Sequence, residues 1–388
     1  MNKKDLELYI HIPFCVRKCR YCDFLSAPAD QNVQDAYMEA LCGEMIQRSG
    51  ECTAYKVSTV FIGGGTPSIV NPAWIRRIMQ ILKENYDLQE RAEITMEINP
   101  GTVSKQSLCL YKEAGINRLS IGMQTTVDEE ARVLGRIHTY EQFLEAYDLA
   151  RKAGFDNINV DIMSALPGQS YESYETTLQR VAGLNPPPEH ISAYSLIIEE
   201  NTPFFELHER KQLSLPDEDT ERRMYELTGV FLKQYGYERY EISNYALPGR
   251  QCRHNVGYWV RKNYLGLGIG AASLMENVRF QNTSDRELYI KNPCAGREEE
   301  QALSNAEQME ETMFLGLRLI KGVSFTAFYK EFGIALEAVY DEVINKHEKE
   351  GLLEEYTADN GEKFLKLTKK GLDVSNYVMA DFLEPSIF

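Results

Sequence analysis

An alternation of short apolar segments with helix-length amphipathic segments constrains the fold of this chain more than any other feature. The apolar segments comprise residues 8–12, 57–62, 93–98, 117–123, 157–163 and 190–198, and the helical segments between them comprise residues 34–49, 73–85, 104–113, 128–152 and 171–182. Strands that are apolar along their whole length are typical of a parallel sheet covered by helices. The sequence therefore predicts an α/β fold built from six strand–helix units.

Polar residues and glycines gather at the ends of these apolar segments. In chain order they are His11 with the cysteines that follow it, Gly63–Pro67, Glu97, Gln124, Asp161, and Tyr194 with Ser195. In a barrel all such strand ends converge on one face, whereas an open doubly wound sheet concentrates function at one switch point. Six units spread over about 200 residues therefore predict an incomplete TIM-type (β/α)6 barrel, with its site at the carboxyl ends of the strands.

Beyond a barrel core that we place at residues 1–200, the sequence predicts two further parts. Residues 201–292 are expected to extend the barrel, with a helix at 217–235 and a short strand at 239–243. Residues 293–388 are expected to form a small C-terminal domain of α+β type.

The C-terminal domain is expected to resemble a winged helix. A linker at 292–305 leads to it. Its predicted elements are helices at 307–320 and 334–350, two strands around Asn360-Gly361, and a last helix at 370–382. Asn-Gly between two strand-like segments is a strong hairpin signal, and the order helix, helix, hairpin, helix suggests the winged shape.

The chain is acidic, with 58 Asp and Glu residues against 42 Lys and Arg residues and a formal net charge of −16. So acidic a surface repels the phosphate backbone of nucleic acids unless it carries a dense basic patch, and the sequence shows none. We therefore expect no nucleic-acid partner. The sequence also shows no apolar signal segment and no long uncharged stretch, which predicts a cytoplasmic protein.

Three of the eight cysteines, Cys15, Cys19 and Cys22, fall within eight residues in Cys-x3-Cys-x2-Cys spacing. Structural zinc sites take four ligands, usually as two separated pairs, and no fourth ligand lies nearby. A [4Fe–4S] cluster held by three cysteines keeps one iron open to a small ligand with amine and carboxylate donors. We therefore favour a cluster, with zinc and three unrelated thiols as the alternatives. His11, at the end of the first strand, is expected to be a hydrogen-bonding residue.

The segment Tyr9–Cys22 resembles the radical S-adenosylmethionine (SAM) superfamily, and its YIHIPFC opening resembles the branch around oxygen-independent coproporphyrinogen III oxidase. The segments GGGTPS, MEINP, SIGMQT, LGRIH and VDIMSALPGQ match that branch in order. The resemblance implies a [4Fe–4S] cluster on Cys15, Cys19 and Cys22 whose open iron binds SAM. It implies SAM contacts by Tyr9, Tyr21, Gly64, Gly65, Thr66, Glu97, Gln124, Arg136 and Asp161. Within that set, Arg136 suits the SAM carboxylate and Tyr21 suits stacking on adenine.

Two features choose among members of this branch. Phe24 stands where the resemblance to the oxidases calls for a further cysteine, which argues against decarboxylation of coproporphyrinogen. The string HNVGYW at 254–259 is similar to the HNxxYW motif of the haem chaperone HemW family, as is the glycine-rich Tyr264–Ser273. The resemblance implies haem contact by His254, Tyr258 and Trp259, with Cys252 as a further candidate ligand. Taken alone, such a string is more typical of a packed loop.

The leading hypothesis is a haem chaperone that holds a SAM-coordinated [4Fe–4S] cluster, binds haem and delivers it to apo-haemoproteins, above all respiratory enzymes. The alternative is a radical SAM enzyme acting on a tetrapyrrole, similar to oxygen-independent coproporphyrinogen III dehydrogenase, so whether the chain is an enzyme stays open. A third hypothesis is a regulatory or scaffold protein whose cluster sets a conformation. The implied partners are haem, its apo-protein clients, membrane enzymes met by peripheral contact, and a second copy in a cluster-dependent homodimer.

Overall fold

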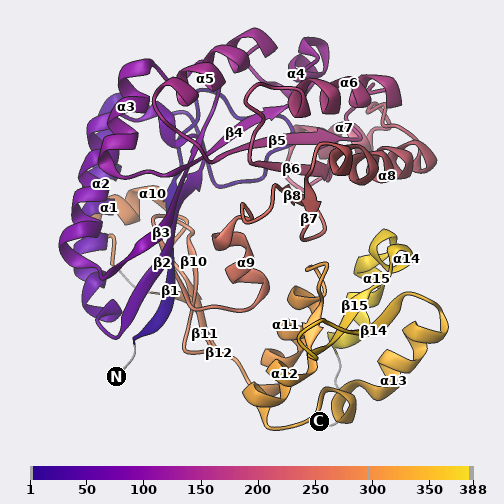
Figure 1. The fold of residues 1–388 in the computed structure, drawn as a ribbon. Coiled ribbons are helices and arrows are strands. Elements are labelled where there is room, and N and C mark those ends of the chain that lie inside the picture. Colours follow the sequence, from indigo (N-terminus) through magenta and orange to yellow (C-terminus); the bar gives the residue numbers. More distant parts are fainter. Residues whose placement is uncertain (1–2, 295–296, 384–388) are drawn as a thin grey trace.

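The computed structural model describes residues 3–294 and 297–383, and its centre is a curved parallel sheet (Figure 1). Its strands are β1 (Lys4–Ile12), β2 (Tyr55–Gly64), β3 (Leu88–Ile98), β4 (Arg118–Gln124), β5 (Ile158–Ser164) and β6 (His190–Ser195). They lie side by side in chain order, and every neighbouring pair is parallel. The predicted α/β fold with six parallel strands is confirmed.

Helices α1 (Gln31–Arg48), α2 (Pro72–Asn85), α3 (Lys105–Ala114) and α6 (Tyr171–Ala182) cover the outer side of this sheet (Figure 1). The single helix predicted at 128–152 is wrong: the segment forms α4 (Asp128–Leu134) and α5 (Tyr140–Lys152). Gly135 ends α4 in the left-handed conformation, with φ of 82°, and Thr139 starts α5 by accepting a hydrogen bond from the Gln142 backbone. These two caps interrupt a helical pattern that is continuous in the sequence.

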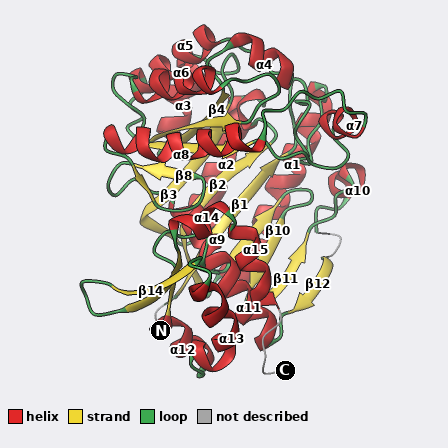
Figure 2. Ribbon diagram, turned by 90° about the vertical axis from the view of Figure 1, so that its right-hand side faces the viewer, coloured by secondary structure: helices red, strands yellow, loops and turns green. Residues whose placement is uncertain are grey.

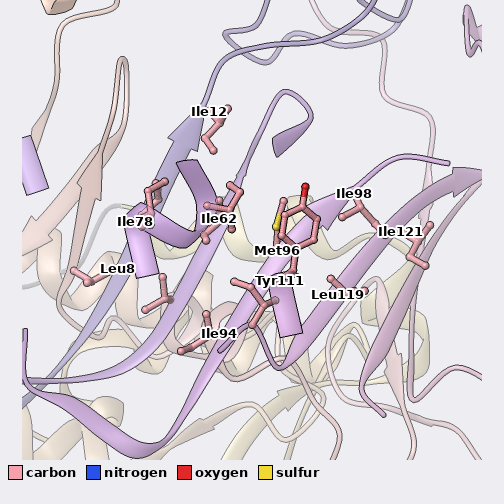
Figure 3. Packing of buried hydrophobic residues seen from close by; sticks show 14 of the residues in the cluster. Leu8, Ile12, Ile62, Ile78, Ile94, Met96, Ile98, Tyr111, Leu119 and Ile121 are labelled. Atoms are coloured by element: carbon pink, nitrogen blue, oxygen red, sulfur yellow. The ribbon is translucent and has the colours of Figure 1, made fainter. Parts of the chain in front are cut away.

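The strands are buried on both sides, with different chemistry on each. Along each strand, every second side chain points outward and is aliphatic, because it packs against the helices. Figure 3 shows this layer, in which strand residues meet helix residues: Leu8, Ile62, Met96 and Leu119 from the sheet, Ile78 and Tyr111 from α2 and α3. The alternate side chains face the barrel interior and are largely polar. Among them, Glu7, Thr59, Glu93 and Arg118 are all buried.

Among the described residues the sheet continues past both edges of the barrel to twelve strands. Strand β9 (Tyr264–Leu267) lies parallel to β1, followed by antiparallel β10 (Ala272–Met275), β11 (Val278–Gln281) and β12 (Glu298–Ala302). At the other edge β8 (Asn244–Ala246) pairs with β6 and then with β7 (Glu238–Arg239). The chain between β6 and β12 also forms the helices α7 (Pro203–Glu209), α8 (Glu218–Gln234), α9 (Arg253–Trp259) and α10 (Arg286–Lys291).

Two predictions for these edges are wrong, while the helix predicted at 217–235 is confirmed by α8. The strand predicted at 239–243 is replaced by the short strands β7 and β8 on either side. The linker predicted at 292–305 contains β12, and residues 295–296 of it lie outside the described residues. Edge strands such as β12, with the sequence EEEQA, owe their conformation to pairing with a neighbour, which a local pattern does not reveal.

The C-terminal part has its own hydrophobic core and its own antiparallel sheet of order β13-β15-β14. Figure 2 shows its helices grouped next to the strand labelled β14. Its elements are α11 (Asn305–Gly316), β13 (Val323–Ser324), α12 (Phe325–Phe332), α13 (Leu336–Lys349), β14 (Leu353–Thr357), β15 (Lys363–Leu367), α14 (Lys369–Asp373) and α15 (Ser375–Ala380). The hairpin around Asn360-Gly361 is confirmed. The last helix predicted at 370–382 is broken at Val374, whose φ of −125° and ψ of 33° are not helical, and α12 was not predicted.

The α+β character predicted for this part is confirmed, while the boundaries at residues 200 and 292 stay predictions. Within 3–294 and 297–383, none of the helices combines the length and the apolar character required to cross a bilayer.

Candidate functional site

The carboxyl ends of the parallel strands surround a cavity of about 470 Å³. Its lining comes from the loop after β1 and from the ends of the following strands, and includes Cys15, Cys19, Tyr21, Cys22, Gly64, Gly65, Thr66, Glu97, Gln124, Arg136, Asp161 and Tyr194. Every residue to which the resemblance assigns a SAM contact is in this lining except Tyr9. Cavities of several hundred cubic ångströms, roughly 300–1,000 Å³, enclose one ligand of drug size.

Cys15, Cys19 and Cys22 lie on the loop between β1 and α1 as partly exposed free thiols that line this cavity. Backbone hydrogen bonds from Cys15 to Ala27 (3.3 Å) and from Ala27 to Pro13 (3.0 Å) close the base of the loop. Burial raises the pKa of the Cys22 thiol to about 11, so a bound metal must displace its proton.

Whether three cysteine thiols suit one zinc ion or a [4Fe–4S] cluster depends on how far apart their sulfur atoms lie. Within the described part of the chain, no three His, Cys, Asp or Glu side chains gather closely enough to hold a single metal ion. The thiolates of one zinc ion all bond it at about 2.3 Å and crowd together. In a [4Fe–4S] cluster each cysteine binds a different iron, so three sulfurs stand farther apart around one cavity.

His11, near the end of β1, is a hydrogen-bonding residue, as its position predicts. Its Nε2 lies 2.8 Å from the backbone oxygen of Leu25, and its Nδ1 lies 3.0 Å from the Tyr9 hydroxyl. Gly64 lies against the His11 ring, and a Cβ at this position would be 2.5 Å from His11 Nδ1. Its φ of 113° also favours glycine. Tyr9 therefore supports the cavity floor through His11 and does not itself line the cavity.

Arg136, which follows α4, connects the cavity wall to the cysteines. Its guanidinium donates to Asn99 Oδ1 (2.8 Å) and toward Cys19 Sγ (3.8 Å). Asn99 donates in turn to the Thr66 hydroxyl (2.8 Å), and that hydroxyl donates toward Cys15 Sγ (3.7 Å). One polar chain thus ties two of the three cysteines in place.

Two half-buried carboxyl groups face the cavity from β3 and β5. Glu97 accepts a hydrogen bond from the Gly64 backbone (3.1 Å), and Asp161 accepts from Asn159 (2.7 Å) and Ser120 (3.1 Å). Burial, reinforced by the nearby Asp161, raises the pKa of Glu97 to about 8, and burial also raises the pKa of Asp161. A cationic ligand group would favour the ionised form of both, so the pair suits an amine or a sulfonium.

Three buried polar atoms of residues that line the cavity lack a hydrogen-bond partner among the described residues, namely Gln124 Oε1, Arg136 Nε and Asn244 Oδ1. Because buried polar atoms are nearly always hydrogen-bonded, two acceptors and a donor left free at a cavity point to a bound ligand or water. With three thiols and two carboxyl groups beside them, these residues fit a [4Fe–4S] cluster and a small ligand carrying amine and carboxylate groups.

The structure places His254 in the barrel interior and not at the cavity. Its side chain is 1% exposed, with Nδ1 2.7 Å from the Thr59 hydroxyl, Nε2 3.0 Å from the Tyr258 hydroxyl and the ring stacked on Phe61. Burial, with a smaller effect of Arg118, lowers the pKa of His254 to about 3, so the imidazole is neutral. Both ring nitrogens are engaged, so His254 can bind haem iron only after one of these contacts opens.

The same interior holds further ionisable groups. Glu93 accepts hydrogen bonds from the backbone of Arg253 and His254 (both 3.1 Å) at the start of α9, and lies 3.6 Å from Cys252 Sγ. Cys252 is fully buried, and burial raises the pKa of its thiol to about 12. Glu7 is also fully buried, 3.8 Å from His254 Nδ1, and neither of its carboxyl oxygens has a hydrogen-bond partner among the described residues.

The rest of the HNVGYW string is likewise packed against protein. Tyr258 meets the rings of His254 and Tyr264 edge-on, with centroids 4.9 and 4.8 Å away, and Trp259 lies 4.3 Å from the Arg318 guanidinium. Asn255 is the one residue of the string that lines the cavity. The structure thus gathers His254, Tyr258 and Trp259 on α9 but turns them toward the barrel interior and the C-terminal part.

Sequence reasoning missed Asn99 and Asn255, which both line the cavity. Asn99 lies two residues after Glu97, so strand alternation places both on the same face and gave a usable signal. Asn255 stands in the HNVGYW string, but the string did not place it at the cavity, because only the tertiary fold brings α9 to the barrel. Arg17 and Lys18, between the first two cysteines, also line the cavity and were not singled out.

Comparison with known proteins agrees with this geometry. The family model described as Radical SAM superfamily matches residues 9–181, and the HemN C-terminal domain model matches residues 303–374. Among solved structures, coproporphyrinogen III oxidase (HemN) from Escherichia coli superposes with a TM-score of 0.83 at 25% identity, covering 98% of this chain and 90% of that chain.

Curated relatives extend the similarity over the whole chain. Heme chaperone HemW of Lactococcus lactis is 36% identical over 384 residues, which cover 99% of this chain and 98% of the relative. Heme chaperone HemW of Bacillus subtilis is 35% identical over 382 residues, covering 97% and 98%. A mitochondrial radical S-adenosyl methionine domain-containing protein 1 of Danio rerio is 31% identical over 400 residues, covering 99% and 87%. The chain therefore belongs to the radical SAM superfamily and, within it, to the haem chaperone HemW family.

Proposed function

We propose that this protein is a haem chaperone, which binds haem reversibly and passes it to apo-haemoproteins. The observation that carries the proposal is the similarity over nearly the whole chain to relatives named heme chaperone HemW. Phe24 supports it, because an exposed apolar side chain lines the cavity where the resemblance to the oxidases calls for a thiol.

In this proposal Cys15, Cys19 and Cys22 hold a [4Fe–4S] cluster, and SAM binds beside it in the cavity. When bound, the cluster supplies an electron to SAM or fixes the conformation of the loop. Arg136 and Asn99 position the cysteine sulfurs, while Glu97 and Asp161 offer anionic partners for the positive groups of SAM.

Haem contact by His254, Tyr258 and Trp259 stays a prediction of the sequence motif. It would require α9 to release the hydrogen bonds that its histidine makes with Thr59 or Tyr258. Each such bond contributes about 0.5–1.5 kcal/mol, and the opening must also separate the buried His254 ring from Phe61.

The test is an anaerobic optical titration of the cluster-reconstituted protein with haem, with and without SAM, followed by mixing with an apo-globin. The proposal predicts a shifted Soret band on binding and the spectrum of the holo-globin after mixing. Free-haem spectra throughout the titration would contradict it.

A second candidate function is a radical SAM reaction on a tetrapyrrole. The cavity favours it, because a carrier has no evident need for a SAM site with paired carboxyl groups. Anaerobic incubation with coproporphyrinogen III, SAM and a reductant tests it: release of 5′-deoxyadenosine with a changed substrate supports an enzyme, and the absence of both removes this candidate.

We further propose a cytoplasmic location, respiratory haemoproteins as the clients, reached at the membrane by peripheral contact, and a homodimer that depends on the cluster. The acidic net charge of −16 disfavours tight binding to an anionic membrane surface, so the proposed membrane contact is transient. Light scattering of cluster-loaded and cluster-free protein tests the dimer, which should disappear when the iron is removed.

A further inference from the structure

Exposed aliphatic and aromatic side chains border the mouth of the cavity. Phe24, 59% exposed, and Ile197, 68% exposed, line the main cavity, one after the cysteine loop and the other after β6. Val16 (58%) and Ile137 (53%) line a small adjoining cavity that shares Arg17, Cys19 and Arg136 with the main one. We call Val16, Phe24, Ile137 and Ile197 the apolar rim. Exposed apolar groups gathered around one opening mark a site of interaction.

Unpaired positive charges accompany the apolar rim. Among the described residues, Arg17, Lys18 and Arg20 have no carboxylate within ion-pair distance, although acidic residues outnumber basic ones by 58 to 42. Arg17 and Lys18 line the main cavity, where the acidic Asp23 and Glu199 also lie. The Arg17 guanidinium donates to the backbone oxygen of Gly135 (2.7 Å), which leaves its charge without a carboxylate counter-ion among the described residues.

We infer that the apolar rim and the cations Arg17 and Lys18 form the docking surface for haem, an inference that rests on the proposed function. The occupant must be flat and apolar over most of its area and must carry carboxylates at one edge, which describes a haem with its two propionates. The Phe24 ring and the Ile197 side chain contact the macrocycle, and Arg17 and Lys18 pair with the propionates. In the proposed function SAM occupies the cavity of about 470 Å³, so the larger macrocycle would lie across its mouth.

This surface is separate from His254, Tyr258 and Trp259, although Asn255 of the HNVGYW string lines the same cavity. His254 bonds Thr59, which lies five residues before the end of β2 at Gly64. At about 3.3 Å per residue, that places the histidine roughly 15 Å below the strand ends, inside the barrel. The two assignments of the haem contact therefore make opposite predictions for the same variants.

The first test measures the haem dissociation constant of the full-length, cluster-reconstituted protein in the presence of SAM. The double variant Phe24→Ser/Ile197→Ser should bind haem at least about tenfold more weakly, because both side chains lose contact with the macrocycle. Both side chains are exposed, so folding should be unaffected. Val230→Ser is the matched control, since Val230 is 62% exposed on α8 and should leave the constant unchanged. An unchanged constant in the double variant would overturn the inference.

The second test uses charge. Lys18→Met keeps most of the aliphatic stem and removes the ammonium group. The wild-type protein should bind haem more tightly than haem dimethyl ester, and Lys18→Met should reduce that preference several-fold while keeping its iron content. An equal affinity of the wild-type protein for acid and ester would show that the cations serve only the cluster, and would overturn the propionate assignment.

The third test separates this inference from the proposed function. If the motif assignment is right, His254→Gln loses the shifted Soret band and the rim variant keeps it; that result would overturn the docking surface and leave the haem chaperone standing. The docking surface predicts that the rim variant loses the shifted Soret band and that His254→Gln keeps it. A wild-type protein that binds no haem under any of these conditions would overturn the proposed function itself.

Discussion

Glu7 shows at the scale of single residues how unusual the barrel interior is. Its carboxyl group is fully buried without a hydrogen-bond partner among the described residues, and burial raises its pKa to about 8. The unfolded value is about 4.5, so the folded protein binds a proton here that the unfolded chain releases. The stability that this proton contributes is complete below pH 4.5 and is lost as the pH rises toward 8.

The variant Glu7→Gln tests this linkage. Relative to the wild-type protein, its free energy of unfolding should rise by about 2–3 kcal/mol between pH 6 and pH 8, because each pKa unit of difference corresponds to about 1.4 kcal/mol. Urea denaturation at several pH values measures it, with exposed Glu90→Gln in β3 as the control. A difference between Glu7→Gln and wild type that stays constant with pH would contradict the prediction.

Gly257, within the HNVGYW string, is constrained by the same carboxyl group. A Cβ at this position would lie 1.9 Å from Glu7 Oε1, so Gly257→Ala should destabilise the fold by about 1–3 kcal/mol or more. Gly43→Ala is the control, because a Cβ added at Gly43 in α1 would meet none of the described residues within 4 Å, and alanine there should be neutral or stabilising. Thermal melts compare the two, and equal melting temperatures would refute the crowding at Gly257.

At the scale of the elements, the site depends on contacts between a loop and the strand ends around it. Arg136, after α4, and Thr66, after β2, meet at Asn99, after β3, and each then approaches one of the cysteine sulfurs. Two strand–helix connections and the connection between α4 and α5 therefore position one loop. That arrangement explains why chemistry concentrates at this face of the barrel.

Asn99→Ala should remove the shared partner of Arg136 and Thr66 while leaving every cysteine in place. We expect SAM to bind about thirtyfold more weakly at most, since two hydrogen bonds of about 1 kcal/mol each no longer hold the wall of its cavity. Equilibrium dialysis with SAM measures the affinity, and iron analysis should give the wild-type content. Asn85→Ala on α2 is the control. Unchanged SAM binding in Asn99→Ala would count against this chain of contacts.

Elements whose pattern is local could be predicted from the sequence, and elements that depend on neighbours could not. The six parallel strands are recognisable because their outer faces are aliphatic, and the Asn360-Gly361 hairpin because its turn residues specify it. The break at Gly135 was missed because the helical pattern continues across it, and β12 because only its pairing with β11 makes it a strand. The position of His254 could not be predicted, because a motif does not state whether its helix faces solvent or a barrel interior.

At the scale of the whole molecule, the C-terminal part is joined to the barrel through α9 and the residues after it (Figure 1). Glu311 of α11 accepts from Arg261 (3.0 Å) and pairs with Arg279 (2.7 Å), and it is almost fully buried. Trp259 at the end of α9 packs against Arg318. The segment that carries the haem chaperone motif therefore also forms the junction between the two hydrophobic cores.

Glu311→Gln should weaken this junction by about 3 kcal/mol, because the buried Arg261 then keeps only the half-exposed Glu331 as an ionic partner. Trp259 is one of two tryptophans, so its fluorescence in a Trp74→Phe background reports on the junction during urea denaturation. Glu331→Gln is the control: Glu331 also pairs with Arg261, but at 3.5 Å and with a half-exposed side chain, and should cost less than about 1 kcal/mol. Equal losses in the free energy of unfolding for Glu311→Gln and Glu331→Gln would contradict the prediction.

The central claim is that Cys15, Cys19 and Cys22 hold a four-iron cluster with one iron left for SAM. Electron paramagnetic resonance of the anaerobically reconstituted and reduced protein, recorded before and after SAM is added, tests it most directly. We predict a [4Fe–4S] signal that changes when SAM binds and that disappears in Cys22→Ser but persists in Cys109→Ser. A protein that takes up no iron, or a cluster signal indifferent to SAM, would contradict the claim.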